Sequence, residues 1–229
     1  MMLSVLMPAY NEAQTLLAEV KRTLDVDYPC AIELIVVDDG SSDDTPRVLE
    51  AVSDERFRWY RHPCNQGKGA AVRTAASLAE GDYVVVLDAD LEYAPADIPR
   101  LLEPILRGEA EVVYGTRTFS SHTAYSFWYV VGNKAVTLWA NVLFNSWVSD
   151  VETCLKVLPL ALYRTLGLTC TGFGMEAEIT GKLLRLRRLP YEVSVTYRAR
   201  RREDGKKLTW RDGVEALWIL LRVRLSLGL

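Results

Sequence analysis

The chain has 229 residues, of which 49% are hydrophobic and 25% are charged, and its formal net charge is −3. These proportions are close to the average of globular proteins and exclude disordered, collagen-like and coiled-coil chains. The length fits one compact α/β domain better than two independent domains. Four widely separated cysteines and two histidines exclude a disulfide framework and a structural zinc site, so we expect reduced thiols and a cytoplasmic protein.

The basic residues are concentrated towards the C-terminal end. Residues 182–229 carry 13 Lys and Arg against 5 Asp and Glu, whereas the remaining residues carry 14 against 25. A basic segment beside an acidic body favours an anionic partner near that end, although a solvated basic surface would give the same pattern. The acidic body argues against nucleic acid as the partner.

Strand-like and helix-like stretches alternate over the first half of the chain. Continuous apolar runs at 33–37 and 83–87 are typical of strands that are buried on both faces. The predicted strands are 3–7, 33–37, 57–61, 83–87 and 111–114, and the predicted helices are 12–24, 67–79, 95–107 and one that begins near Pro46. Repeated strand–helix units predict a mainly parallel central sheet flanked by helices.

The second half of the chain is less regular. We predict strands over 152–158 and 191–197, a helix over 175–187 and a terminal helix from about residue 208. The terminal helix is amphipathic, and its apolar face would pack on the core or lie flat on a membrane. That face comprises Trp210, Val214, Leu217, Trp218 and Leu221. No apolar run approaches the roughly 20 residues of a membrane span, so we expect a soluble protein.

Residues 118–149 are unusually aromatic. They hold eight of the 22 aromatic residues and a single Lys, Arg, Asp or Glu residue, Lys134. The aromatic side chains are either buried within the domain or form an apolar surface that faces lipid or an apolar acceptor.

Polar residues follow three of the predicted strands, at 8–12 (PAYNE), 38–41 (DDGS) and 88–92 (DADLE). Ligands of open parallel sheets bind at the carboxyl ends of the strands. Asp and Gly are ordinary turn residues, but three such sets in order are hard to explain as turns alone. The pattern therefore predicts a nucleotide site at this edge of the sheet.

Asp88 and Asp90 are the strongest candidates for a metal site. They follow a hydrophobic strand and offer the hard oxygen ligands that Mg²⁺ or Mn²⁺ prefers, and Glu92 would add a third oxygen. Such an ion stabilises a diphosphate as a leaving group. The alternative is that these carboxylates only form the turn or cap a helix.

In this order the motifs PAYNE, VDDGS, NQGKG (65–69) and DAD resemble the family 2 glycosyltransferases. They resemble more narrowly the branch that contains dolichol-phosphate mannose synthase and bacterial polyprenyl-phosphate glycosyltransferases. The resemblance continues through 115–117, 150–156, 173–176 and 205–207, so it covers nearly the whole chain.

The resemblance implies a single GT-A (Rossmann-like) domain over 1–229 that transfers a sugar, with inversion, from a UDP- or GDP-sugar in the presence of Mg²⁺ or Mn²⁺. Residues 1–117 would bind the nucleotide-sugar and the metal, and residues 118–229, with the C-terminal amphipathic helix, would bind the acceptor. The implied acceptor is a polyprenyl or dolichyl phosphate, or another anionic acceptor. The implied location is the cytoplasm, with peripheral contact to the inner face of the membrane.

Site residues follow from motif position. The implied nucleotide-binding residues are Pro8, Ala9, Tyr10, Glu12, Val37, Asp39, Lys68, Asp88 and Ala89. The implied metal ligands are Asp88, Asp90 and Glu92, the last replacing a residue that is often Gln in the mannose-synthase relatives. Arg117 and Arg200, with Arg201 and Arg202 as alternatives to the latter, would contact the diphosphate or the acceptor phosphate. Lys68 fits the start of a helix equally well.

Asp150 bears on the mechanism. A hydroxyl acceptor must lose a proton as it attacks, so a carboxylate base contributes to its reaction. A phosphate monoester is already largely dianionic near pH 7 and needs only placement and charge balance. Asp150 is therefore a catalytic base, a residue that orients the acceptor or binds the ion, or a residue with a purely structural role. The rival functions are transfer to a soluble hydroxyl acceptor and a non-catalytic nucleotide-binding partner of a membrane subunit.

Overall fold

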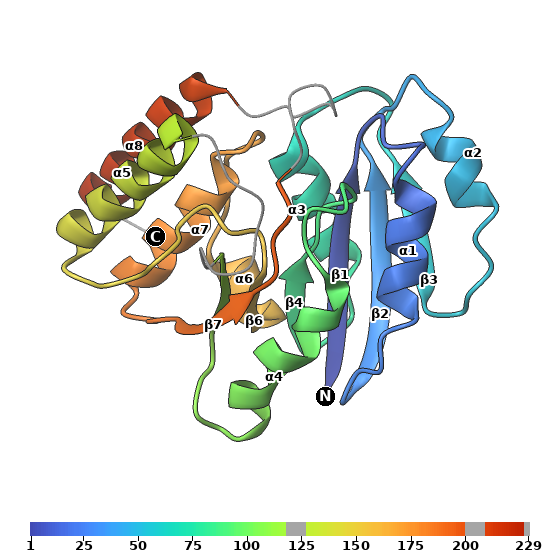
Figure 1. Cartoon of the computed structure of the whole chain (residues 1–229), viewed down its shortest axis with the longest axis horizontal. Helices are drawn as coiled ribbons and strands as arrows, with labels where there is room; N and C mark the ends of the chain where they lie inside the picture. The colour runs from blue at the N-terminus through green and yellow to red at the C-terminus, as the bar shows by residue number, and fades with distance from the viewer. Residues whose placement is uncertain (118–126, 200–208, 227–229) are drawn as a thin grey trace.

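The computed structural model describes residues 1–117, 127–199 and 209–226. Within them, one seven-stranded sheet has the strand order β3-β2-β1-β4-β6-β5-β7 and is flanked by helices (Figure 1). The strands are β1 (Met2–Ala9), β2 (Ala31–Asp38), β3 (Phe57–Arg61), β4 (Tyr83–Val86), β5 (Val113–Arg117), β6 (Lys156–Pro159) and β7 (Tyr191–Val195). The predicted single α/β domain with a mainly parallel sheet is confirmed.

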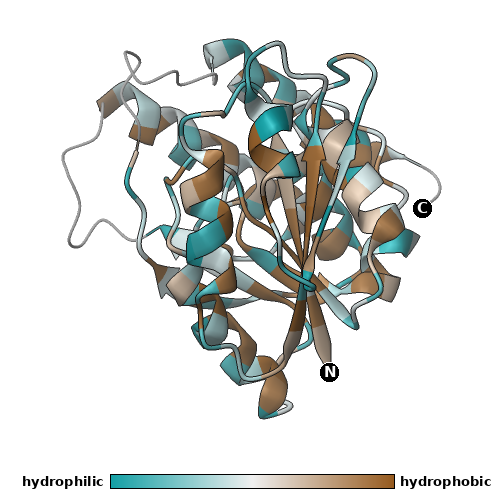
Figure 2. Cartoon of the chain, turned by 90° about the vertical axis from the view of Figure 1, so that its right-hand side faces the viewer, coloured by the Kyte–Doolittle hydropathy of each residue, from teal (hydrophilic) through white to brown (hydrophobic). Residues whose placement is uncertain are grey.

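All the described helices except the last lie between strands along the chain, and α8 follows β7. They are α1 (Leu16–Leu24), α2 (Thr45–Glu50), α3 (Lys68–Leu78), the 3₁₀ helix η1 (Pro95–Asp97), α4 (Ile98–Leu106), α5 (Phe127–Phe144), α6 (Leu160–Thr165), α7 (Met175–Arg185) and α8 (Trp210–Leu225). Figure 2 shows hydrophobic residues along the strands at the centre of the domain. This agrees with β1 and β2, whose side chains are almost all buried.

The only antiparallel strand of the described sheet is β6, which pairs with β4 on one side and β5 on the other. Its direction follows from the turn that precedes it. Asp150 is held against Arg117 at the carboxyl end of β5, so the chain enters β6 from that edge of the sheet and runs back. The predicted strand over 152–158 is therefore wrong in its first residues, which form the turn beside the carboxyl edge.

Two helices were not predicted. α5 occupies most of the aromatic segment, and α6 is a single short helix after β6. α5 contains one charged residue, Lys134, and apolar side chains occur all around it. Because the helix has no polar face, its sequence lacks the 3.6-residue alternation of apolar and polar residues by which an amphipathic helix is predicted.

The terminal helix α8 is present, but the face that it buries is not the predicted one. It packs against α5 and α7 through Ala216, Ile219, Leu220 and Val223. The residues predicted to pack on the core include Trp210, Val214 and Trp218, and these three are exposed. The small side chain of Ala216 allows close packing, which the bulky tryptophans would prevent.

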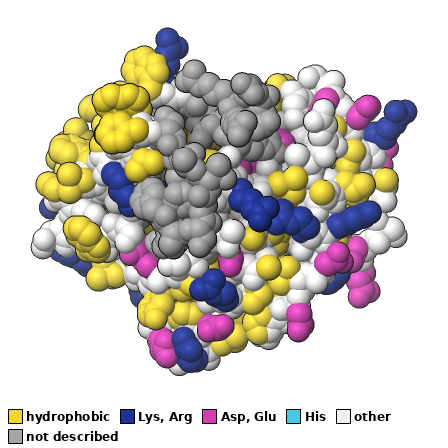
Figure 3. Space-filling view, viewed as in Figure 1, with side chains coloured by type: hydrophobic (Ala, Val, Ile, Leu, Met, Phe, Trp, Pro, Cys, Tyr) yellow, Lys and Arg dark blue, Asp and Glu magenta, His cyan; other side chains and the backbone are white. Residues whose placement is uncertain are grey.

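α5 and α8 lie side by side and together expose an apolar surface (Figures 1 and 3). The residues of this α5–α8 surface are Phe127, Trp128, Val131, Leu138 and Val142 of α5 and Trp210, Val214, Trp218 and Leu225 of α8. Among the described aromatic residues of 118–149, Phe144 is buried and Trp128 is 77% exposed, so the segment is buried in part and exposed in part. Phe119 and Tyr125 lie outside the described residues. None of the described helices combines the length and hydropathy needed to cross a membrane.

Candidate active site

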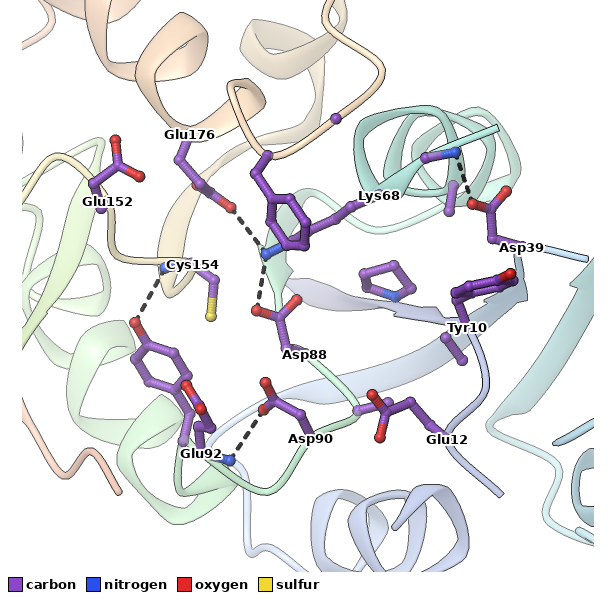
Figure 4. A pocket seen from close by; sticks show the side chains of 18 of the residues that line it. Tyr10, Glu12, Asp39, Lys68, Asp88, Asp90, Glu92, Glu152, Cys154 and Glu176 are labelled. Atoms are coloured by element: carbon purple, nitrogen blue, oxygen red, sulfur yellow. Dashed lines mark hydrogen bonds and ion pairs between the residues drawn. The ribbon is translucent and has the colours of Figure 1, made fainter. Parts of the chain in front are cut away.

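A cavity of about 250 Å³ lies at the carboxyl ends of β1, β2, β4 and β5 (Figure 4). Parallel strands end at the same edge, so the polar residues that follow each strand meet there. The cavity is lined by Pro8, Ala9, Tyr10, Glu12, Asp39, Lys68, Asp88, Ala89, Asp90, Glu92 and Arg117, all singled out from the sequence. It is also lined by Glu152, Cys154, Phe173, Glu176 and Tyr197, for which the sequence indicated no separate role.

Two residues from the sequence analysis do not line this cavity. The side chain of Val37 is fully buried in the hydrophobic core, so it does not face the cavity. Asp150 lines a small neighbouring hollow that it shares with Arg117 and Asn133. Arg200, like Arg201 and Arg202, lies outside the described residues.

Asp39 holds the loop that leads into α3. Its carboxylate accepts hydrogen bonds from the backbone N–H groups of Gln66 (3.0 Å) and Gly67 (2.7 Å). His62 Nδ1 lies 2.7 Å from the same carboxylate, which can only accept, so this nitrogen carries the proton. Gly67 has a φ of 96°, and a Cβ there would lie 2.4 Å from the carbonyl oxygen of Thr171. The loop thus requires glycine at this position and delivers Lys68 to the cavity.

Lys68 places a positive charge between two carboxylates. Its Nζ lies 2.8 Å from Asp88 Oδ2 and 3.5 Å from Glu176 Oε1 (Figure 4). Burial alone would lower the pKa of Lys68, but Asp88 and Glu176 hold it above its usual value. Lys68 therefore stays protonated. Glu176 also contacts the buried Lys156, whose Nζ lies 2.5 Å from its Oε2.

The three predicted metal ligands do not form a cluster. Asp88 pairs with Lys68, Asp90 Oδ1 accepts the backbone N–H of Glu92 (3.0 Å), and the Glu92 carboxylate accepts a hydrogen bond from the Tyr197 hydroxyl. No group of three or more His, Cys, Asp or Glu side chains is arranged for a metal within the described ranges. Asp88 and Asp90 still line one cavity with hard oxygen donors and so fit a divalent ion whose remaining ligands come from a bound diphosphate.

Arg117 and Asp150 form a bidentate ion pair. Arg117 Nε lies 2.6 Å from Asp150 Oδ2, and Nη2 lies 2.7 Å from Oδ1. Asn133 Nδ2 donates a further hydrogen bond of 3.3 Å to Oδ1. Burial alone would raise the pKa of Asp150, but Arg117 keeps it below its usual value. With both oxygens occupied, Asp150 is suited to positioning Arg117 rather than to accepting a proton.

The sequence model described as glycosyl transferase family 2 matches residues 4–147, well over half of the chain. The chain belongs to glycosyl transferase family 2. The match covers the strand-end motifs around the cavity and Arg117.

Curated relatives of this family 2 chain match parts of it. Glycosyltransferase AglD of Haloferax volcanii is 35% identical over 127 residues, which are 53% of this chain and 20% of the relative. Undecaprenyl-phosphate 4-deoxy-4-formamido-L-arabinose transferase of Proteus mirabilis is 37% identical over 123 residues, 50% of this chain and 36% of the relative. The matches span between a fifth and about half of the curated relatives' length.

The family 2 domain also resembles solved structures. Glucosyl-3-phosphoglycerate synthase from Mycobacterium tuberculosis, in complex with Mn²⁺, UDP and phosphoglyceric acid, superposes with a TM-score of 0.73 at 21% identity. The alignment covers 99% of this chain and 80% of that one. The predicted GT-A fold is thereby confirmed.

Proposed function

We propose that the chain transfers a sugar, with inversion, from a nucleotide-sugar to a polyprenyl phosphate at the cytoplasmic face of a membrane. The observation that carries the proposal is the pairing of Arg117 with Asp150 at one end of the cavity that holds Lys68 and Asp88. A fixed cation for the donor and a second one for an anionic acceptor thus face the same space. In this arrangement residues 1–117 serve the donor and residues 118–229 serve the acceptor.

The donor end holds the nucleotide. Tyr10, Glu12 and Asp39 would surround the nucleoside, and Pro8 and Ala9 would form the floor beneath it. Asp39 already accepts several hydrogen bonds, so it would act mainly by fixing the loop that covers the nucleotide. Ala89, small and buried, leaves room for the diphosphate next to Asp88.

A divalent ion, Mg²⁺ or Mn²⁺, would be held by Asp88 and Asp90. When bound, it neutralises the diphosphate that leaves. Support comes from the neighbouring structures that contain Mn²⁺ together with UDP. Lys68 adds a permanent positive charge at the same place. Glu92, which accepts a hydrogen bond from Tyr197, would form part of the cavity wall rather than act as a third metal ligand.

The acceptor end suits a phosphate. Arg117 would pair with the phosphate oxygens, and Asp150 would hold the guanidinium in place for it. Near pH 7 a phosphate monoester carries most of its second negative charge and attacks without a base. Relatives named undecaprenyl-phosphate transferases support this acceptor class.

Membrane contact would come from the α5–α8 surface. The same two helices carry the exposed cations Lys134 on α5 and Arg211, Arg222 and Arg224 on α8. Exposed tryptophans beside basic side chains are typical of proteins that lie on anionic membranes. α5 also contributes Tyr129 to the cavity wall, so a lipid-bound acceptor would reach the site from this side.

The test uses the chain with Mn²⁺ or Mg²⁺, a panel of UDP- and GDP-sugars, and polyprenyl phosphate in detergent. The expected product is a polyprenyl-phosphate sugar, which mass spectrometry detects. Transfer to a soluble glycan in place of polyprenyl phosphate would establish the hydroxyl acceptor. Nucleotide binding without any transfer would support the non-catalytic partner of a membrane subunit.

A further inference from the structure

Glu152 differs from the other charged groups at the acceptor end of the cavity. Arg117 is paired with Asp150 at 2.6 Å, and Lys156 with Glu176 at 2.5 Å. Glu152 Oε1, in contrast, is buried and has no hydrogen-bond donor among the described residues. A buried polar atom without a partner calls for an explanation, and a missing ligand is one of the few available.

The backbone around Glu152 is fixed on both sides. Its N–H donates to Asp150 Oδ1 at 3.2 Å, and Lys156 Nζ donates to the carbonyl oxygens of Val151 (3.0 Å) and Thr153 (2.6 Å). The side chain lines the cavity beside Glu176 and Cys154 (Figure 4). Glu152 is therefore held at the wall by contacts that do not involve its own carboxylate.

The pKa of Glu152 is raised to about 7, chiefly by burial and also by the nearby Glu176 and Asp150, and against the opposite effect of Lys156 and Arg117. At neutral pH the site thus holds a partly ionised carboxylate whose buried Oε1 has no hydrogen-bond donor among the described residues. Such a group is costly to the folded protein unless a ligand supplies the donor.

The neighbouring Glu176 restricts which class of ligand fits beside Glu152. Its Oε1 also lacks a hydrogen bond from the described residues and has only Lys68 Nζ, 3.5 Å away. Two carboxylates side by side repel a phosphate and need a neutral ligand with several donors. Sugar hydroxyl groups fit this requirement. The two carboxylates line the same cavity as Lys68, beside the proposed diphosphate, and Arg117, beside the proposed acceptor.

We propose that Glu152 determines donor specificity by accepting a hydrogen bond from a hydroxyl or N–H group of the transferred sugar. This inference rests on the proposed function, because it takes the cavity to hold a nucleotide-sugar.

The test compares the binding of nucleotide-sugar and nucleotide by calorimetry in the presence of Mn²⁺. Two pairs of probes are used, UDP-glucose with UDP and GDP-mannose with GDP. The proteins are the wild type, Glu152→Ala and Glu152→Gln. The control is Glu103→Gln, which alters an exposed residue of α4. Loss of a hydrogen bond to a charged group should weaken the binding of the matching nucleotide-sugar to Glu152→Ala roughly tenfold or more. The affinity for the nucleotide alone and all affinities of Glu103→Gln should stay within about twofold of wild type.

The pH dependence gives a second measurement. An ionised carboxylate is the stronger acceptor, so the affinity of the wild type for the nucleotide-sugar should rise as the pH rises from 6 to 8. Glu152→Gln should lose this dependence. The flanking Asp150, Arg117, Lys156 and Glu176 are unchanged in that variant, so a persisting dependence would assign it to them and contradict the proposal.

Two further outcomes would overturn the inference. Equal losses of affinity for nucleotide and nucleotide-sugar in Glu152→Ala would show that Glu152 does not recognise the sugar. Unchanged donor affinity with a loss of transfer to a hydroxyl acceptor would make Glu152 a base instead. A wild type that binds neither nucleotide nor nucleotide-sugar would overturn the proposed function itself, which distinguishes the two failures.

Discussion

The ammonium of Lys68 lies 2.8 Å from the carboxylate of Asp88, the first acidic residue after β4. One of the two proposed metal ligands is thus already neutralised by the chain. The donor diphosphate would meet a fixed cation as well as a divalent ion, and Lys68 and the ion share Asp88 as a partner.

Replacing Lys68 by Met should destabilise the protein in the absence of metal, because it leaves Asp88 and Glu176 without their shared cation. Added Mn²⁺ should then raise the melting temperature of Lys68→Met more than that of the wild type, since Asp88 becomes available to the ion. Thermal unfolding with and without Mn²⁺ measures both effects. Equal responses of the two proteins to Mn²⁺ would count against Asp88 as a ligand.

Replacing Asp150 by Ala should cost about 3 kcal/mol of unfolding free energy, because it leaves the buried guanidinium of Arg117 unpaired. The matched control is Asp44→Ala, which breaks an exposed pair with Arg47 and should cost at most about 0.5 kcal/mol. Urea unfolding compares the two. If Asp150 positions Arg117, Asp150→Ala should also bind the acceptor more weakly and bind the nucleotide as the wild type does. If only the transfer rate at saturating acceptor falls, and acceptor affinity is unchanged, Asp150 is a catalytic base.

Replacing Glu152 by Gln should change how stability depends on pH. The pKa of Glu152 is raised in the folded protein, so its contribution to stability is present below about pH 4.5 and is lost as the pH rises through about 7. Glu152→Gln lacks this loss and should melt roughly 2–4 °C above the wild type at pH 8, with the two converging near pH 5. A constant difference across this range would mean that Glu152 does not titrate near neutrality.

Replacing Gly67 by Ala should disrupt the loop that Asp39 holds. Gly67 and Gly108 both have positive φ, but only at Gly67 would a Cβ meet a backbone atom, the Thr171 carbonyl oxygen. Gly108→Ala should therefore cost about 1 kcal/mol, for the backbone conformation alone, and Gly67→Ala clearly more. Gly67→Ala should also lose affinity for nucleotide. Denaturant unfolding measures the two losses of stability, and calorimetry measures nucleotide affinity. Similar losses of stability in Gly67→Ala and Gly108→Ala would contradict the close approach of Gly67 to the Thr171 carbonyl oxygen.

Replacing Trp218 by Ser should reduce binding to vesicles that contain anionic phospholipid, by roughly tenfold, since it removes a large apolar side chain from the α5–α8 surface. Leu106→Ser, at an exposed apolar residue on the unrelated helix α4, is the control and should bind as the wild type does. Vesicle sedimentation measures the binding. If Trp218→Ser and Leu106→Ser bind the vesicles equally well, the α5–α8 surface is not the membrane contact.

The features that sequence predicted well are those that local patterns determine. Buried parallel strands have continuous apolar runs, and the polar residues after them must meet at one edge of the sheet, so Asp39, Asp88 and Asp90 could be grouped in advance. The face buried by α8 could not be predicted, because both Trp218 and Ile219 lie on apolar faces and only packing decides which is covered.

The contribution of Glu152 and Glu176 to the cavity depends on contacts distant in sequence. Lys156 in β6 holds Glu176 of α7, and Arg117 in β5 holds the turn that precedes Glu152. No local periodicity encodes these pairings. The motifs around both residues were apparent in the sequence, but the side chains that face the cavity within each motif were not.

The position of β6 determines how this domain can be divided in protein engineering. β6, from the second half of the chain, lies between β4 and β5 of the first half, and β5 has only β6 and β7 as neighbours. A fragment ending at residue 117 would carry β5 with no strand to pair with. The two halves are therefore interleaved, and a chimera that exchanges acceptor-binding parts between related enzymes should carry β5, β6 and β7 together as one piece.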